Sequence, residues 1–358
     1  MFKKKTLPVL MFIIITGCSQ ATNNTDGTSD TNTLRHYASL RGINIGAAVS
    51  SSYLNESMYA LTLYSQFDMV TAEWEMKFSP VQDIRSNFNY SGGDAIVNFA
   101  LAHNMKVRGH ALIWHQAVPV WLTNKTWTSN ELDNIMKYHI SNVVTHFKGK
   151  LACWDVVNEA IDDNSPTNGL RKTFWYNIMG PGYIDQAFRY ARQFDSNVLL
   201  FYNDYSGEGL NSKADAIYSL VTNMLARGVP IDGLGLQMHI DTSGYPTNNN
   251  FLSNISRFTA LGLKVHITEL DVRIPIPASS AELTKQAQIY HDLMALCLQN
   301  TNVTAFVMWG FTDKYSWVPD FFNTANGYST NYGAALPFDE NYNKKPAYNS
   351  LLNALKGY

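Results

Sequence analysis

The feature that most constrains the fold of this 358-residue chain is a regular alternation of short apolar runs with longer amphipathic segments. The short runs are rich in β-branched and aromatic residues, which favours strands. Several are apolar along almost their whole length, as is typical of parallel strands covered by helices. The eight runs are Arg41–Ala47, Phe67–Thr71, Met105–Ile113, Leu151–Val157, Asn197–Tyr202, Asp232–Met238, Leu263–Thr268 and Val303–Trp309.

Amphipathic helical patterns fill the gaps between these runs, for example over Gly93–His103 and Glu131–Phe147. Eight strand–helix units without an intervening linker predict the α/β class and a single (β/α)₈ TIM barrel, not two domains. We therefore expect residues 36–358 to form one catalytic barrel. The active site of such a barrel lies at the carboxyl ends of its strands, so the residues found there are the candidates for function.

The N-terminal residues do not belong to this pattern. Lysines at positions 3–5 precede an apolar stretch that is too short to span a bilayer, which predicts a signal peptide. The sequence Ile15-Thr16-Gly17-Cys18 resembles a bacterial lipobox, so we expect a lipoprotein signal peptide over 1–17 and lipidation of Cys18. Polar residues predict a flexible tether over 18–35. The protein is then exported and lipid-anchored to a bacterial outer membrane or cell surface, with secretion as the alternative.

Charge and motif content narrow the function further. The 27 basic and 29 acidic residues are nearly balanced. Proteins that bind nucleic acid usually carry clustered basic charge, so we do not expect nucleic acid as a partner. No glycine-rich phosphate loop follows the first strand, and no G-x-S-x-G motif is present. We expect the protein to use no cofactor. We also expect it to be a monomer. A metal centre is an alternative that no closely spaced ligand motif supports; it would use His110, His115, His239 and Glu269.

Two glutamates end the fourth and seventh predicted strands, Glu159 and Glu269. A barrel brings these strand ends to one mouth. Paired carboxyls across a sugar-sized gap are what glycoside hydrolysis needs, because one protonates the leaving oxygen while the other attacks or activates water. Beside them, Asn158 could donate a hydrogen bond to a sugar hydroxyl, and His239 could hold Glu269 ionised.

At these motifs the chain resembles glycoside hydrolase family 10, the retaining endo-β-1,4-xylanases. The resemblance runs from about residue 40 to residue 356, nearly the whole predicted mature chain. It is carried by four segments and by the stretch from Pro337 to Tyr348. The four segments are Arg108–His115, Trp154–Ala160, Ile267–Val272 and Trp309–Trp317.

The resemblance implies that Glu159 is the acid/base and Glu269 the nucleophile of a double-displacement mechanism on xylan. Residues implied around the cleaved sugar and near Glu269 are His110, Asn158, His239 and Gln237. Residues implied to bind or roof the glycone side are Glu73, Lys77, Trp309 and Trp317, while Tyr205 would lie towards the leaving group. We also place Trp74 and Trp114 in the sugar groove, and Asp271 in a supporting role.

Two positions depart from the family pattern, and both fall in the second glycone subsite. Trp74 stands where the family usually has an asparagine, and Ala117 stands where it has a glutamine, although Gln116 could partly compensate. Exchanging two hydrogen-bonding side chains for an indole favours stacking. Linear xylan, mixed-linkage or decorated xylan and another β-glycan are therefore all candidate substrates. A different class of function, a non-catalytic surface protein that binds xylan, would need neither glutamate.

Overall fold

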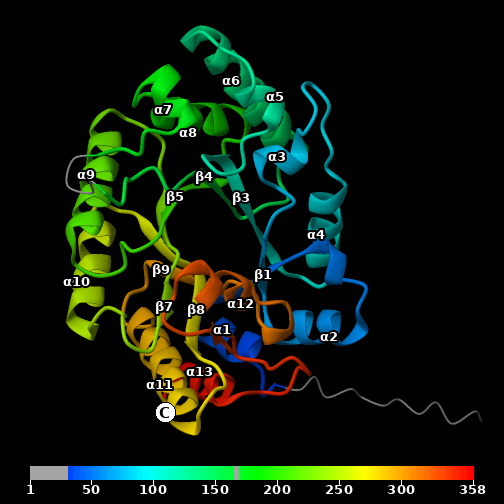
Figure 1. Ribbon diagram of the computed structural model, residues 1–358, viewed down its shortest axis with the longest axis vertical. Helices are drawn as coiled ribbons and strands as arrows, with labels where there is room; N and C mark the ends of the chain where they lie inside the picture. Colours follow the sequence, from blue (N-terminus) through cyan, green and yellow to red (C-terminus); the bar gives the residue numbers. More distant parts are fainter. Residues whose placement is uncertain (1–30, 165–168) are drawn as a thin grey trace, which may run out of the picture. The chain divides into compact units, whose positions relative to one another are not determined.

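A closed barrel of parallel strands forms the centre of the computed structural model, which describes residues 31–164 and 169–358 (Figure 1). Each strand pairs in parallel with the next around the barrel, and β8 and β1 both pair with β9, which closes it. The fold is thus a single (β/α)₈ barrel. Its strands are β1 (Asn44–Val49), β2 (Met69–Ala72), β3 (Lys106–Trp114), β4 (Cys153–Asn158), β5 (Leu199–Asp204), β6 (Gly233–Leu236), β8 (Lys264–Pro275) and β9 (Val303–Met308).

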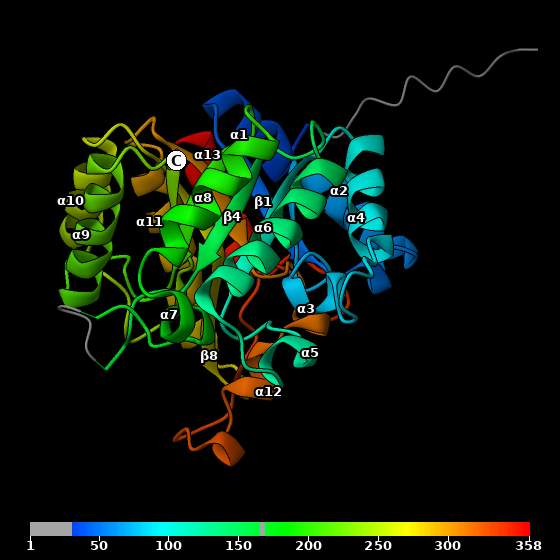
Figure 2. The same cartoon turned by 90° about the horizontal axis from the view of Figure 1, so that it is seen from above.

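Helices surround the barrel and bury its outer face, which is why the outward-facing side chains of the strands are apolar (Figures 1 and 2). The long helices are α1 (Leu34–Arg41), α2 (Ser57–Gln66), α4 (Ser91–Ala102), α6 (Ser129–His146), α8 (Tyr183–Phe194), α9 (Ser212–Ala226), α10 (Asn248–Thr259), α11 (Ser280–Cys297) and α13 (Pro346–Lys356). Shorter helices lie in the connections: α3 (Phe78–Val81), α5 (Val120–Thr123), α7 (Phe174–Met179), α12 (Val318–Phe321) and the 3₁₀ turns Ser51–Tyr53, Asp313–Tyr315 and Thr324–Asn326. In the described part of the chain, no helix is long and apolar enough to cross a membrane.

The predicted start of the first strand was wrong. Arg41 is the last residue of α1, because Gly42 adopts a left-handed conformation (φ 70°) and its N–H bonds to carbonyls of that helix. The strand begins only at Asn44. Since α1 begins at Leu34 with Thr33 as its N-cap, the last residues of the predicted tether belong to the folded body. The predicted signal peptide and Cys18 lie outside the described residues.

The seventh predicted strand is longer than we expected. Instead of ending at Thr268, β8 continues to Pro275, so Glu269 lies inside the strand. The outer half of β8 pairs with two further short strands. The short strand β7 (His239–Asp241) pairs with it in parallel, and β10 (Tyr332–Gly333) pairs with it antiparallel. The extension of β8 reaches the side of the barrel where the loop after β9 projects (Figure 2, orange).

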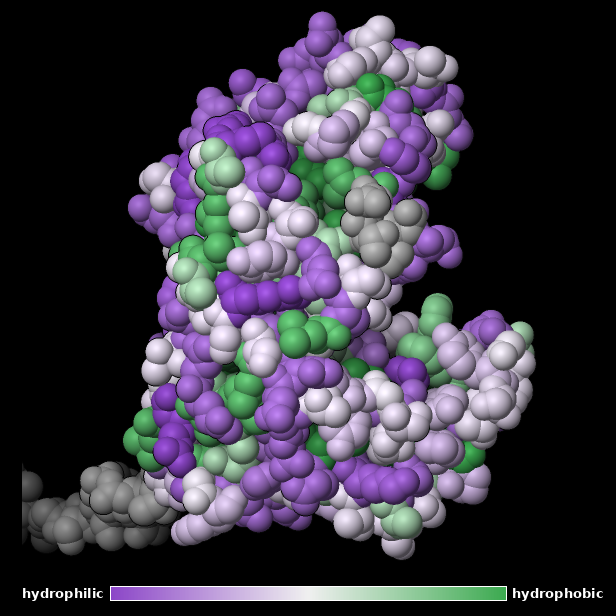
Figure 3. Space-filling view, turned by 90° about the vertical axis from the view of Figure 1, so that its left-hand side faces the viewer, coloured by the Kyte–Doolittle hydropathy of each residue, from purple (hydrophilic) through white to green (hydrophobic). Residues whose placement is uncertain are grey.

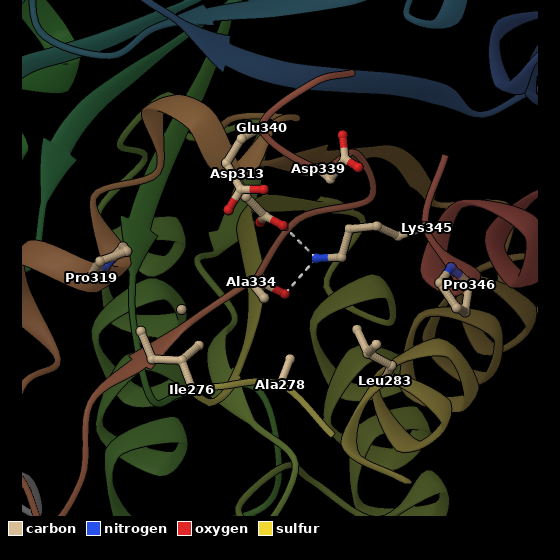
Figure 4. Close-up of a pocket in the computed structure, with 11 residues that line it drawn as sticks. Ile276, Ala278, Leu283, Asp313, Pro319, Ala334, Asp339, Glu340, Lys345 and Pro346 are labelled. Atoms are coloured by element: carbon tan, nitrogen blue, oxygen red, sulfur yellow. Dashed lines mark hydrogen bonds and ion pairs between the residues drawn. The ribbon is translucent and has the colours of Figure 1, made fainter. Parts of the chain in front are cut away.

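A cavity of about 360 Å³ lies between the end of β8, β10 and the first turns of α11 and α13 (Figure 4). Its charged centre is the buried pair of Lys345 and Asp313, whose Nζ and Oδ2 atoms are 2.6 Å apart. Lys345 also donates to the carbonyl of Ala334 at 2.6 Å. Because these groups satisfy one another, we assign them a structural role: they fasten the loop after β9 to the start of α13.

Candidate active site

Glu159 follows β4 directly and is held there by both its backbone and its side chain. Its φ of 58° is unusual for a residue with a side chain, and its N–H donates to the carbonyl of Asn203 at 2.9 Å. Three neutral donors reach the nearly buried carboxylate. Asn158 and Gln237 each donate to Oε1 at 3.1 Å, and the indole of Trp114 donates to Oε2 at 2.9 Å. The side chain is thereby fixed in orientation without an ion pair in the described structure.

Glu269 lies in β8 at the same mouth, in a more strongly charged setting. Asn203 Nδ2 donates to its Oε1 at 2.7 Å, and His239 Nε2 lies 3.2 Å from its Oε2. The opposite ring nitrogen of His239 lies 2.8 Å from Asp271 Oδ2, which also accepts the indole N–H of Trp317 at 2.8 Å. The imidazole of His239 is therefore held between two carboxylates.

This arrangement sets the charges of His239 and Glu269. Burial lowers the pKa of His239, but the charge and hydrogen bond of Asp271, aided by Glu269, outweigh burial and raise it to about 10. The ring is then a cation at neutral pH and donates from both nitrogens. Burial raises the pKa of Glu269, but the hydrogen bond from His239 and the nearby positive charges bring it below its ordinary value. Glu269 is consequently ionised.

A short chain of amides joins the two glutamates. Asn203 donates from the same nitrogen to Glu269 and, at 2.9 Å, to Oδ1 of Asn158, the neighbour of Glu159. Its own oxygen accepts from Thr268 at 2.7 Å, so this fully buried amide is satisfied. Space for it comes from Gly235 on β6, where a Cβ atom would lie 2.2 Å from Asn203 Oδ1. Both carboxylates therefore belong to one hydrogen-bonded constellation.

His110 is positioned from within the barrel. Its Nδ1 lies 2.9 Å from Asp155, and Asp155 forms a two-pronged ion pair with Arg108 at 2.6 and 3.1 Å. Arg108 and Asp155 are both completely buried. A buried ion pair is tolerated only when its remaining polar atoms are also bonded, and here His110 supplies one of those bonds. The network fixes the ring of His110, which also meets Trp309 edge to face at 5.4 Å.

Beside this centre is a cavity of about 330 Å³, lined by Ser50, Tyr53, Glu73, Trp74, Lys77, Trp309 and Trp317. Its cation is Lys77, whose Nζ lies 4.7 to 5.5 Å from the ring centroids of Trp114, Trp74 and Trp309. Burial lowers the pKa of Lys77, and the charges of Glu269 and Glu73 oppose that effect. Aromatic faces with one polar cation among them suit a sugar, which presents C–H faces and hydroxyls.

On another side of the mouth, Tyr205 is held by charged groups. Its hydroxyl bonds to Asp163 and, at 3.0 Å, to Arg171, which also donates to the backbone carbonyl of Glu159 at 3.2 Å. The ammonium of Lys213 lies 3.3 Å from the ring centroid. The position of Tyr205 is therefore tied to the backbone of Glu159.

Comparison with known proteins decides the family. The model described as glycosyl hydrolase family 10 matches residues 33–354. The chain belongs to glycosyl hydrolase family 10. It is 40% identical over 348 residues to endo-1,4-beta-xylanase B of Thermotoga neapolitana, with 96% of each chain covered. Two solved structures share its fold with TM-scores of 0.86. Xylanase 10B of Thermotoga petrophila RKU-1, in complex with xylobiose, is 42% identical; the match covers 91% of this chain and 97% of that one. Native xylanase 10B of Thermotoga maritima is 41% identical, and the match covers 91% of this chain and 98% of that one.

Within this family 10 barrel, the sequence-predicted residues divide by position. One group surrounds the two glutamates, and the other lies at the cavity beside Trp74 and Lys77, called the glycone cavity below. Ala117 is different: it is buried, and its carbonyl accepts from Ser79 at 3.0 Å, so its side chain does not line the cavity. Gln116 is exposed. Of the two departures from the family pattern, only Trp74 therefore shapes the cavity wall.

Two residues of the site were missed from the sequence. Ser50 and Tyr53 follow β1 and line the cavity, where Tyr53 stacks on Tyr315 with ring centroids 3.7 Å apart. No charge or motif marks this loop as functional. Asn203 comes directly after the predicted strand Asn197–Tyr202, but its bond to Glu269 depends on a contact between strands that the sequence does not reveal.

Replacing His239 with asparagine should move the acidic limb of the kcat/KM profile upward by about one pH unit or more. The wild-type cation favours the ionised form of Glu269, so its loss raises the pKa of that carboxyl and protonates the carboxyl at higher pH. A pH series on an aryl xylobioside measures the limb. His291→Asn on α11 is the matched control. An unmoved acidic limb in His239→Asn would show that Glu269 does not depend on this charge.

Proposed function

We propose that this protein is a retaining endo-1,4-β-xylanase that works by double displacement. In the first step an oxygen of Glu269 attacks the anomeric carbon of a xylose unit, and Glu159 gives its proton to the glycosidic oxygen as that bond breaks. In the second step Glu159 takes a proton from water, the water oxygen attacks the same carbon, and the bond to Glu269 breaks. The chain's similarity to named xylanases supports the choice of xylan.

The observation that carries this proposal is the unequal environment of the two glutamates. Cationic His239 contacts Glu269, which suits a group that must stay ionised to attack. Glu159 instead contacts two amides and an indole and has no ion pair in the described structure, so the two glutamates face different charges, as their two roles require. The sugar would be held between His110, Lys77 and the indoles that surround Lys77, those of Trp74, Trp114 and Trp309.

Analysis of the products from xylans and β-glucans tests the function. We expect linear β-1,4-xylan to be cut internally, giving a falling viscosity and a series of short oligosaccharides, with the β-anomer formed first. Products from β-glucans alone would point to another β-glycan. Binding to xylan without turnover would favour the surface-binding protein; in that case Glu269→Ala would bind as well as the parent.

We further propose that Trp74 reshapes the second glycone subsite, so that a mixed-linkage or decorated xylan is accepted at least as well as the linear polymer. Its indole lines the cavity and is 49% exposed, and it supplies a stacking face in place of an amide. Trp74→Asn should therefore change the ratio of kcat/KM on mixed-linkage to linear xylan by about two- to tenfold. Rates on both polymers measure it. An equal ratio in parent and variant would leave the indole a packing role only.

We also propose that the protein is exported and lipid-anchored through Cys18, and acts as a monomer. The support for export and for the anchor is the sequence pattern at Lys3–Lys5 and Ile15–Cys18. Cys18→Ala should shift the protein from the membrane fraction of the producing cell. An unchanged distribution would contradict the anchor.

A further inference from the structure

The loop after β9 has an unusual composition. From Phe321 to Tyr332 the chain reads FFNTANGYSTNY, which contains four aromatic residues and no charged one, in a protein where 16% of residues are charged. The remaining side chains are mostly amides and hydroxyls. Rings and neutral polar groups are what recognise an uncharged polyol. They do not suit an anionic surface, which would require lysine or arginine.

The loop leaves the barrel directly from the active site. Trp317 lines the glycone cavity and donates to Asp271, the partner of His239. One helical turn later in α12, the ring of Phe321 lies 5.2 Å from the ring of Trp317. The aromatic wall of the cavity therefore continues outward along this loop, which projects from the carboxyl ends of the strands (Figure 2). Figure 3 shows the surface on this side hollowed between two projections.

Neighbouring residues hold the loop in one conformation. Asn323 and Asn326 each donate two hydrogen bonds to backbone carbonyls of α12, at 2.9 to 3.0 Å. The backbone of Asn331 accepts from Ile276, and β10 pairs with β8. An aromatic side chain on such a loop loses little further entropy when it binds a ligand.

The two phenylalanines of the loop have different roles. Phe322 is 7% exposed and packs against Trp317, against Tyr328 and under the guanidinium of Arg273, 4.1 Å from its centroid, so it anchors the loop. Phe321 is 49% exposed, although the rings of Trp317, Phe322 and Tyr328 lie 4.9 to 6.3 Å from its own. The loop is thus anchored by one ring while it presents the other to solvent.

From this geometry we propose that Phe321, with the uncharged rim of the loop, is an accessory stacking position for the xylan chain outside the catalytic cleft. The inference rests on the proposed function, because its occupant is the continuation of the same polysaccharide. The argument for that occupant is continuity: the ring adjoins Trp317, which already lines the cavity. Short substrates do not extend to this position, so Phe321 contributes only to the binding and hydrolysis of polymers.

The test compares Phe321→Ala and Phe321→Trp with Leu40→Ala, a control at an exposed apolar residue of α1. In Figure 2, α1 and α12 lie at opposite ends of the barrel. We expect Phe321→Ala to lower kcat/KM on polymeric xylan by about two- to twelvefold, and Phe321→Trp to keep it near the value of the parent. The rate on an aryl xylobioside should stay unchanged in all three. In the Glu269→Ala background, affinity electrophoresis in xylan gels should show the same loss of binding.

Three results would overturn the inference. The first is equal activity of Phe321→Ala and parent on the polymer together with equal binding in the gel. The second is an equal loss on the aryl xylobioside, because Phe321 would then act only through Trp317. The third is a concentration-dependent dimer of the parent that Phe321→Ala abolishes, which would make the ring a contact between copies of the chain. A parent that hydrolyses no xylan would instead contradict the proposed function. Affinity electrophoresis would still show whether Phe321 binds the polymer.

Discussion

Glu269→Ala should lower kcat on xylan by about 10⁴- to 10⁶-fold, the largest loss that we expect from any single substitution. The variant lacks the oxygen that forms the glycosyl–enzyme bond, and no other carboxylate replaces it, because Asp271 is committed to His239 and Trp317. Rates with an aryl xylobioside measure the loss, since a reactive leaving group does not remove the need for a nucleophile.

Small anions distinguish this loss from misfolding. Azide can enter the space left by Glu269 and attack the anomeric carbon from the same side, which gives an α-xylosyl azide with the configuration inverted. Glu340→Ala, at an exposed glutamate near the pocket of Figure 4, is the control and should retain full activity. Substantial activity in Glu269→Ala without azide would rule out a covalent intermediate on this residue.

The sequence predicted the barrel and its mouth because both rest on local patterns. Each strand is a short apolar run that the chain repeats after each helix, and Glu159 ends such a run. Prediction was less accurate where partners distant in sequence determine the structure. The length of β8 depends on β7 and β10, and those strands are too short to leave a periodic signal of their own.

The same limit applies within the site. His239 was predicted to hold Glu269 ionised, since a histidine near a carboxylate has that effect in any fold. Its second partner, Asp271, makes the cation stable, and this follows only from the pairing of β7 with β8. Asn203 is similar: an asparagine at a strand end is common, and its bond to Glu269 requires the space above Gly235 and the hydrogen bond from Thr268.

Glu159→Ala should show a different pattern of loss, which depends on the leaving group. On xylan, whose leaving group is a poorly acidic sugar hydroxyl, we expect kcat/KM to fall by about 10²- to 10⁴-fold, the usual contribution of general acid catalysis. On a dinitrophenyl xylobioside the first step needs no proton, so attack by Glu269 should stay fast. The covalent intermediate should then accumulate, because water lacks its general base, and a burst of dinitrophenol measures it.

Azide gives the opposite stereochemistry in this variant. It attacks the glycosyl–Glu269 intermediate from the face that Glu159 has vacated, so the product is a β-xylosyl azide and turnover rises. Glu159→Gln is the matched control for side-chain volume, since its amide fills the place that Trp114, Asn158 and Gln237 surround but cannot supply a proton. If both glutamate variants gave the same azide anomer, the separate roles assigned to Glu159 and Glu269 would be wrong. Opposite anomers require a nucleophile on one face and an acid/base on the other, as the cation beside one glutamate and the neutral donors beside the other indicate.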